Sequence, residues 1–389
     1  MSPDLSTSPA AARVAPHLDA VDAAIAESES SARMPAPLAR RLADAGLLTL
    51  GLPRRHGGPE APCAELCETI ELVSRTHASA GWCVMIASTT STLAAYLDPE
   101  HAATVFADPA TIVGGVTAPS GTATIDGDTV RVEGRWSWGS GSENCAWFAL
   151  GCLVTENGHT VTNAAGQPSV RLVLLPADDV RIAPNWDVSG LRGTGSHDLV
   201  VDGAVAPAGR AVELGIDRPR IDGALYRFPI FGLLALGVAS VSLGIARAAI
   251  DDLVSLAGAK TPTGHRRLPR DRAMTQVDVA RAEASLRAAR AYFYESIAAA
   301  WDVATTGAPL SLEHRTSLRL AATHAATIAT EVVGAMYTAG GGSAIRADNP
   351  LQRHLRDVHV PTQHIMVAPA TWEVAGRALV GLDPANPAW

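Results

Sequence analysis

Residues Gly341–His364 read GGSAIRADNPLQRHLRDVHVPTQH and combine a glycine cluster, a proline turn, alternating cations and three histidines. The histidines, His354, His359 and His364, are spaced five residues apart. Five residues turn a helix by about 140°, so the three rings cannot share one face as metal ligands would. We therefore predict no metal site. A histidine that faces a pocket beside a glycine turn is a better candidate for acid–base chemistry, whereas a lone histidine is usually structural.

Asp357 and His364 are seven residues apart, a spacing that puts two side chains on the same face of a helix. The sequence predicts that Asp357 begins such a helix, with Pro361 in its first turn, where a missing N–H costs little.

A second marked stretch, GRWSWGSG at Gly134–Gly141, ends a predicted strand in a turn of small residues. Trp136 and Trp138 are two residues apart and should point to the same face of the strand. An indole on a strand can cover a flat aromatic cofactor, and a glycine turn lets backbone N–H groups approach it. A sheet face packed on a helix would give the same pattern, so both interpretations stay open. Thr117, at the end of an earlier strand, either hydrogen-bonds a ligand or is an ordinary strand-end residue.

The bulk composition is that of a well-packed globular protein of two or three domains, because 389 residues exceed one typical core. Hydrophobic residues make up 47% of the chain and charged residues 18%. The net charge of −8 disfavours nucleic acid or an anionic membrane as the main partner. Five scattered cysteines and an N-terminus without a signal-peptide pattern predict a cytoplasmic protein with reduced thiols.

One uncharged segment, Phe228–Ala246, is nearly long enough to span a membrane. It also carries Pro229, three glycines and two serines. A helix that is hydrophobic all round can lie at the centre of a large bundle, and this is the interpretation that we favour.

The character of the sequence changes twice along the chain. Residues 1–110 show helical spacing of Ala and Leu, residues 111–215 hold short β-branched or aromatic segments between turns, and helical runs return over 216–389. The evenly spaced strands indicate a small barrel or sandwich. The long runs Arg281–Ala300 and Leu312–Met336, together with the apolar segment, indicate an antiparallel bundle. The expected fold class is α+β and mostly α.

No dinucleotide-binding motif is present. Gly193–Gly195 and Gly139–Gly141 lack the third glycine and the following helix of a G-x-G-x-x-G motif, and no Walker A sequence occurs. The chain therefore shows no nicotinamide-binding domain of its own.

Taken together, these features resemble the acyl-CoA dehydrogenase superfold over nearly the whole chain. The resemblance is carried by the α–β–α order, Thr117, the strand at Gly134–Gly141, DVSGLRGTGS at Asp187–Ser196 and NPLQRHLRD at Asn349–Asp357. It implies an N-terminal helical domain (1–110), a central β domain (111–215) and a C-terminal four-helix bundle (216–389). It also implies a homotetramer with flavin near a subunit interface.

Two branches of the superfold compete. Acyl-CoA dehydrogenases commonly carry a glutamate base just before the proline of the C-terminal motif, where this sequence has Asp348, one methylene shorter. A base that must reach a substrate proton tolerates shortening poorly. The motif N-P-L-Q-R, followed by R-D-x-H and a further histidine, is more similar to the two-component (group D) flavin-dependent monooxygenases. These include hydroxyphenylacetate hydroxylase, dibenzothiophene monooxygenase and amino-sugar nitrososynthases.

This resemblance implies roles for particular residues. Ser140 and His364 match the serine and histidine on the reactive face of the flavin and are the expected catalytic residues. Ser140 would hold the N5 region of the ring, and His364 would donate to the C4a-hydroperoxide formed with O2 or relay its proton. Arg353 and Arg356 would bind flavin phosphate in a neighbouring subunit or pair with acids. The expected cofactor-binding residues are Thr117, Trp138, Gly139, Ser140, Gly341, Ser343 and Arg353.

The resemblance also implies reduced FAD or FMN as cofactor, a separate NAD(P)H-dependent flavin reductase as partner, and a small organic substrate. Phenol-hydroxylating members tend to have a histidine in the helix after the S-x-G-W motif. Here the motif is Ser79–Trp82 and the matching position is Thr90, which favours a larger or nitrogen-containing substrate such as a polyketide, indole or amino sugar. The alternatives are an acyl-CoA dehydrogenase with Asp348 or another carboxylate as base, and a non-catalytic scaffold that binds a ligand or partner.

Overall fold

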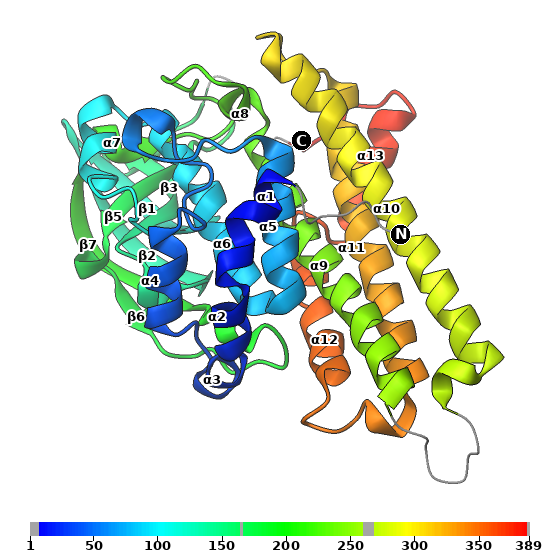
Figure 1. Ribbon diagram of the computed structural model, residues 1–389. Helices are drawn as coiled ribbons and strands as arrows, with labels where there is room; N and C mark the ends of the chain where they lie inside the picture. Colours follow the sequence, from blue (N-terminus) through cyan, green and yellow to red (C-terminus); the bar gives the residue numbers. More distant parts are fainter. Residues whose placement is uncertain (1–7, 164–165, 260–267, 387–389) are drawn as a thin grey trace.

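The computed structural model describes residues 8–163, 166–259 and 268–386. Along the chain, helices precede and follow a β region, and in space the N-terminal helices lie between the sheet and the C-terminal helices (Figure 1). The N-terminal helices are α1 Pro9–Val14, α2 Leu18–Ala23, α3 Ile25–Ser31, α4 Ala36–Asp44, α5 Cys63–Thr76, α6 Ala78–Thr90 and α7 Pro99–Val105. The C-terminal helices are α8 Ala224–Arg227, α9 Ile230–Ala259, α10 Ala273–Thr305, α11 Leu312–Gly340, α12 Pro350–Val358 and α13 Ala370–Leu379. The expected fold class is confirmed.

The central strands form one curled sheet. They are β1 Val113–Asp126, β2 Thr129–Gly139, β3 Trp147–Glu156, β4 His159–Thr160, β5 Val170–Pro176, β6 Arg181–Ala183, β7 His197–Pro207 and β8 Ala211–Val212. Their order is β6-β7-β2-β1-β3-β5-β8, with β4 beside β3, and β1 runs parallel to β3. Three strands separate β5 from β7 in this order, yet these two strands contact each other. The sheet therefore wraps around a core that includes Trp136, Phe148 and Leu199.

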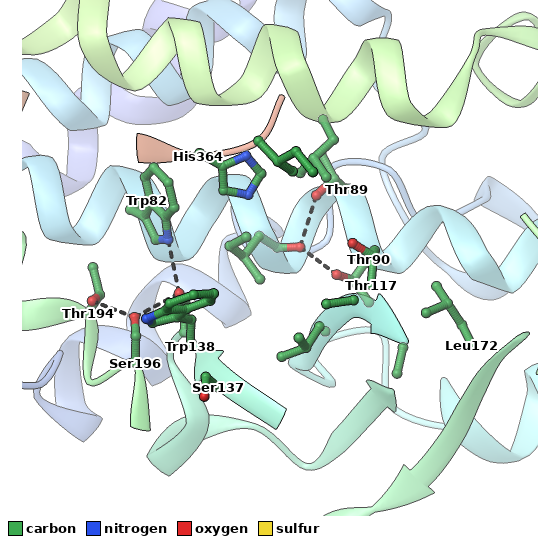
Figure 2. Close-up of a pocket in the computed structure, with 18 of the residues that line it drawn as sticks. Trp82, Thr89, Thr90, Thr117, Ser137, Trp138, Leu172, Thr194, Ser196 and His364 are labelled. Atoms are coloured by element: carbon green, nitrogen blue, oxygen red, sulfur yellow. Dashed lines mark hydrogen bonds between the residues drawn. The ribbon is translucent and has the colours of Figure 1, made fainter. Parts of the chain in front are cut away.

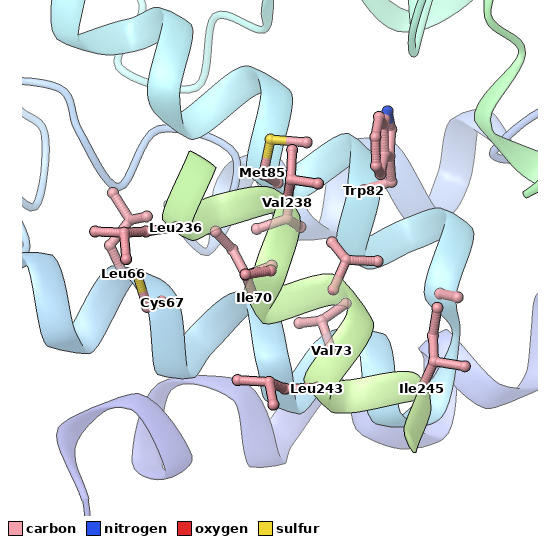
Figure 3. Close-up of a cluster of buried hydrophobic side chains, with 14 of the residues drawn as sticks. Leu66, Cys67, Ile70, Val73, Trp82, Met85, Leu236, Val238, Leu243 and Ile245 are labelled. Atoms are coloured by element: carbon pink, nitrogen blue, oxygen red, sulfur yellow. The ribbon is translucent and has the colours of Figure 1, made fainter. Parts of the chain in front are cut away.

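Helix α9 is the apolar segment of the sequence, and it lies inside the protein. It contacts α5 and α6 of the N-terminal region and α10, α11 and α12 of the C-terminal region. Figure 3 shows its Val238 beside Met85 and Ile70. Helix α9 is long and apolar enough to cross a membrane, but 94% of its most apolar window is buried within the protein. The prediction of a buried bundle helix is confirmed.

The glycines of α9 explain why two helices approach it so closely. A Cβ atom at Gly244 would lie 2.4 Å from the backbone oxygen of Glu71 in α5, and one at Gly237 would lie 2.6 Å from the Met85 side chain in α6. Small residues at these positions let α9 pack directly against the backbone of its neighbour. Because α6 carries part of the cavity described below, this packing positions that cavity.

The two tryptophans of β2 do not share a face, so that prediction is wrong. Trp136 is 0% exposed, and its indole N–H donates to the Gly151 carbonyl at 2.6 Å. Trp138 is 71% exposed and has a φ of 67°, in the left-handed region. Between Trp136 and Gly139 the register of β2 against β7 shifts. This bulge breaks the two-residue alternation and turns the second indole outward.

The start of α12 also differs from the prediction. The helix begins at Pro350, and the Asn349 side chain caps it by accepting the Leu351 N–H at 2.9 Å. Asp357 therefore lies in the last turn of α12 instead of the first. Pro361 opens a separate short 3-10 helix, η11 (Pro361–Gln363). An asparagine cap followed directly by proline at the first helical position is a stronger signal for the start of a helix than an aspartate four residues before a proline.

Candidate active site

A cavity of about 450 Å³ lies where the sheet meets helices from both ends of the chain (Figure 2). Helix α6, strand β1, the turn after β2 and the segment after α12 all contribute to its wall. Ser140 and His364, which come from the two marked stretches of sequence, both line it. The residues that bring rings or hydroxyls into the wall include Trp82, Thr90, Thr117, Trp138, Ser140, Ser196 and His364.

His364 presents a neutral imidazole to this cavity. Its Nδ1 accepts the backbone N–H of Met366 at 3.3 Å, so the ring proton belongs on Nε2. Trp82 packs edge-on against the imidazole, with the ring centroids 5.8 Å apart. Burial lowers the pKa of His364 to about 4, and the nearby Arg319 cation acts in the same direction. At neutral pH the side chain is therefore an uncharged N–H donor.

Ser140 sits in a buried row of hydroxyl groups. It is 7% exposed, and its Oγ accepts the indole N–H of Trp82 at 3.0 Å. The same Oγ lies 2.8 Å from the Ser196 Oγ, which lies 2.7 Å from the Thr194 Oγ1 (Figure 2). The turn that carries Ser140 is tied to the same loop, because Gly141 N donates to the Thr194 carbonyl at 2.7 Å. The position of Ser140 is thus set by α6 and by residues 194–196.

His364 is the one titratable side chain among the described residues that line the cavity. None of the described residues in this wall carries a carboxylate. Asp348, the candidate dehydrogenase base, lies on the surface with its side chain 70% exposed, where it pairs with Arg346 at 3.1 Å. It cannot act as a base in this cavity, because a general base must come within hydrogen-bond reach of the proton it removes.

The geometry beside Thr117 fits a flat ring with polar edges. The β1–β3 ladder pairs Val116 with Leu150 and resumes only at Gly121 with Cys152, so residues 117–120 bulge out of it. Backbone groups released from a ladder can bind a ligand. Trp138 offers an exposed indole at the rim of the same cavity. A flavin ring, which is flat, aromatic and edged with donors and acceptors, matches this combination of surfaces.

Some of the predicted catalytic and cofactor-binding residues line the cavity, and others do not. Thr117, Trp138, Ser140 and His364 line it. Gly139 lies next to Ser140 but packs against Leu199, where an added Cβ would come within 2.7 Å. The remaining three lie outside this wall, and their role toward flavin stays a prediction: Gly341 and Ser343 in η10 (Gly341–Ser343) and Arg353 in α12.

The C-terminal motif Asn349–Asp357 instead holds the loop of residues 187–196, which borders the cavity. Buried Asp357 accepts the Leu191 N–H at 2.6 Å, and burial raises the pKa of this carboxyl to about 7. Arg356 donates to the Ser189 carbonyl and pairs with Glu29 at 3.3 Å. Of the two roles left open for Arg356, pairing with an acid is thus observed. The histidine of this motif, His354, bonds Asp252 at 2.7 Å and is buried away from the cavity.

Three residues of the site were not singled out from the sequence. Trp82, Thr194 and Ser196 all belong to motifs quoted above, the S-x-G-W and GTGS sequences, but neither motif says which side chains meet. Trp82 and Ser140 are 58 residues apart, and Ser140 and Ser196 are 56 apart. Pairing at such separations is decided by the tertiary fold.

Comparisons with known proteins agree with this geometry. The sequence matches the acyl-CoA dehydrogenase N-terminal domain over residues 8–106 and the acyl-CoA dehydrogenase C-terminal domain over residues 236–369. It is 36% identical over 334 residues to an indole-3-acetate monooxygenase of Pseudomonas putida, covering 86% of this chain and 84% of that protein. It is 26% identical to the oxygenase component of an FADH2-dependent resorcinol hydroxylase from Rhizobium, covering 98% of both chains.

Solved structures share the whole fold. XiaF from Streptomyces, in complex with FADH2 and glycerol, superimposes with a TM-score of 0.88 at 25% identity, over 97% of this chain and 96% of that one. The 3-HSA hydroxylase of Rhodococcus has a TM-score of 0.90 at 22% identity, over 99% and 100% of the two chains, and so shows the fold alone. The chain belongs to the two-component flavin-dependent monooxygenases of the acyl-CoA dehydrogenase superfold and is an oxygenase component that uses reduced FAD or FMN and a small-molecule substrate, with a separate flavin reductase.

Proposed function

We propose that this oxygenase acts on a flat, nitrogen-containing aromatic ring of the indole type, held in the cavity between Ser140 and the apolar wall. Reduced flavin, when bound, supplies the electrons that activate O2 for transfer of one oxygen atom to the substrate. The observation that carries the proposal is the cavity wall itself, in which His364 is the one titratable group of the described lining. Such a wall suits oxygen transfer. It does not suit an acyl-CoA dehydrogenase reaction, because no carboxylate among the described lining residues is present to remove the substrate proton.

Each proposed site residue has a physical reason for its role. Trp138 and Thr117 would flank the flavin ring, and Ser140 would contact its edge. His364 would keep its Nε2 proton toward the reacting oxygen, because its low pKa leaves the ring neutral and its Nδ1 is already used by Met366. Exclusion of water strengthens these hydrogen bonds, since the electrostatic part of each is larger in a low-dielectric cavity.

The substrate end of the cavity is apolar. Leu172 lies on the far side of the cavity from Ser196 (Figure 2), and Leu93, Leu214, Phe231 and Leu234 line the cavity with it. Thr90 takes the place of the histidine that phenol-hydroxylating members tend to have, and its hydroxyl donates to the Ile86 carbonyl at 2.8 Å. Apart from His364, no described residue of the wall carries a titratable group that could ionise a phenol. An indole ring is electron-rich without losing a proton, and the Pseudomonas putida relative is an indole-3-acetate monooxygenase.

Three further parts of the proposal concern the protein in the cell. A homotetramer would cover apolar side chains that this chain leaves exposed in its C-terminal region, among them Ile345, Leu379 and Val380. Its five cysteines are free thiols, which suits a reducing cytoplasm. The reductase would supply reduced flavin by diffusion or by transient contact.

The test supplies the purified protein with a flavin reductase, NADH, FAD or FMN, indole or indole-3-acetate, and ¹⁸O2. We expect one ¹⁸O atom in the product. His364→Ala should lower product formed per NADH by about tenfold and release more hydrogen peroxide, while still binding flavin, because the variant loses a hydrogen bond made during oxygen transfer. Anaerobic bleaching of bound oxidised flavin by an acyl-CoA would contradict the proposal, and failure to bind either form of flavin would indicate a scaffold.

A further inference from the structure

A chain of four short contacts runs from the Trp82 indole through Ser140 to the Leu191 carbonyl. The Trp82 indole N–H donates to the Ser140 Oγ at 3.0 Å, and the next contacts join Ser140 to Ser196 and Ser196 to Thr194. Thr194 Oγ1 then lies 2.9 Å from the Leu191 carbonyl oxygen. Figure 2 shows Trp82, Ser196 and Thr194 joined in this row beside the cavity. Each contact is short enough to require a hydrogen between its two heavy atoms.

Counting these hydrogens leaves one arrangement. A carbonyl oxygen can only accept, so Thr194 must give its single hydroxyl hydrogen to Leu191. Thr194 then has no hydrogen for Ser196, and Ser196 must donate to Thr194. By the same reasoning Ser140 must donate to Ser196. All three hydroxyl hydrogens therefore point along the chain, toward the Leu191 carbonyl, and none is left to donate to a ligand.

Ser140 is left as an acceptor. A hydroxyl oxygen has two lone pairs, and one of them already receives the Trp82 N–H. The other lone pair is available to the cavity that Ser140 lines. A ligand atom that carries an N–H would be stabilised there, and a ligand atom with a lone pair would be repelled.

We propose that this hydroxyl chain makes the site selective for the reduced flavin, with Ser196 and Thr194 as the positioning residues that set the direction of the Ser140 hydroxyl. The inference rests on the proposed placement of the flavin edge at Ser140. The N5 atom of the isoalloxazine ring carries a hydrogen when the ring is reduced and a lone pair when it is oxidised. An acceptor at Ser140 therefore matches only the reduced form.

The surrounding structure prevents the chain from reversing. Thr194, Ser196 and Ser140 are 1%, 3% and 7% exposed, so water has little access to offer them other partners. Leu191 is held with a φ of 49°, and its N–H donates to the buried carboxyl of Asp357 at 2.6 Å. The carbonyl that ends the chain is thus fixed by α12, and the direction of every hydroxyl follows from it.

The test compares the anaerobic dissociation constants of oxidised and reduced flavin for the full-length protein and its variants. Thr194→Val removes the acceptor for Ser196, and Ser196→Ala removes the acceptor for Ser140. Each change frees the Ser140 hydrogen to point into the cavity. We expect the preference for reduced over oxidised flavin to fall by about tenfold in both variants. For a two-electron couple, that change lowers the midpoint potential of the bound flavin by about 30 mV.

Two controls separate this role from loss of packing. Thr194→Ser keeps the hydroxyl and should retain most of the preference. Thr323→Val makes the same isosteric change at a buried threonine of α11, whose hydroxyl donates to the Arg319 carbonyl at 2.9 Å, and should leave the preference unchanged.

The outcomes distinguish the inference from the proposed site. If Thr194→Val and Ser196→Ala both keep the parent preference while Ser140→Ala loses it, the hydroxyl chain does not set the selectivity, although flavin does contact Ser140. If Ser140→Ala binds both forms of flavin as the parent does, the flavin lies elsewhere and the proposed placement fails with the inference. Should Thr194→Val not fold, Ser196→Ala carries the test alone.

Discussion

Replacing His77 with phenylalanine should make the protein more resistant to mild acid. His77 precedes α6 and is 2% exposed, and neither ring nitrogen has a hydrogen-bond partner among the described residues. Burial lowers the pKa of His77 to about 3, and the Arg353 cation adds to the effect. In the unfolded chain the ring has its ordinary pKa of 6.5. The unfolded state therefore binds a proton that the folded state does not, and stability falls as the pH drops below about 6.5.

The magnitude follows from these two pKa values. At pH 5 the unfolded chain is almost fully protonated at this position and the folded protein is not, so His77 lowers the free energy of unfolding by about 2 kcal/mol relative to pH 8. The loss would approach about 5 kcal/mol below pH 3 if the fold survived. A residue that does not titrate removes this dependence. Phenylalanine also removes two unpartnered polar atoms, which should add about 1 kcal/mol of stability at pH 8.

The assay is urea unfolding at pH 8 and pH 5, followed by circular dichroism, for the parent, His77→Phe and His77→Gln. Both variants should lose about 2 kcal/mol less than the parent between the two pH values. His159→Gln, in the exposed strand β4, is the matched control and should follow the parent. If His77→Phe and His77→Gln lose stability in parallel with the parent, the buried ring is not the source of the acid sensitivity and the reasoning is refuted.

Two further predictions concern the docking of the 187–196 loop on α12. Gly190→Ala would place a Cβ 2.2 Å from the Arg356 carbonyl oxygen, a backbone atom that cannot move aside, so we expect a loss of about 2 kcal/mol or more in urea unfolding and a higher yield of hydrogen peroxide per NADH. Asp357→Asn keeps an acceptor for the Leu191 N–H but cannot ionise. Because the folded pKa of Asp357 is raised to about 7, the folded parent loses stability as the pH rises from about 4 to 7, and the variant should gain on the parent over that range. Equal pH dependence in the two proteins would show that the carboxyl does not titrate there.

Side-chain spacing along the sequence was enough to predict the order of helical and strand regions. Helical and alternating patterns follow directly from side-chain spacing, so the helix–strand–helix order and the buried α9 were predictable. The two marked stretches each contribute a residue to one cavity, Ser140 and His364, and the roles of these residues toward flavin stay a prediction. Motifs of this kind are local, and a local pattern can be read without knowing the fold.

Tertiary structure alone decided the direction in which side chains point and which of them meet. Trp138 and Trp136 lie on different faces of β2 because a bulge against β7 interrupts the strand. Such a bulge depends on the partner strand, which is about sixty residues away along the chain. The chain from Trp82 through Ser140, Ser196 and Thr194 joins three separate segments, and its direction depends on the Leu191 carbonyl that α12 holds in place. Residue types set which hydrogen bonds are possible, but only packing between distant segments brings donor and acceptor within reach.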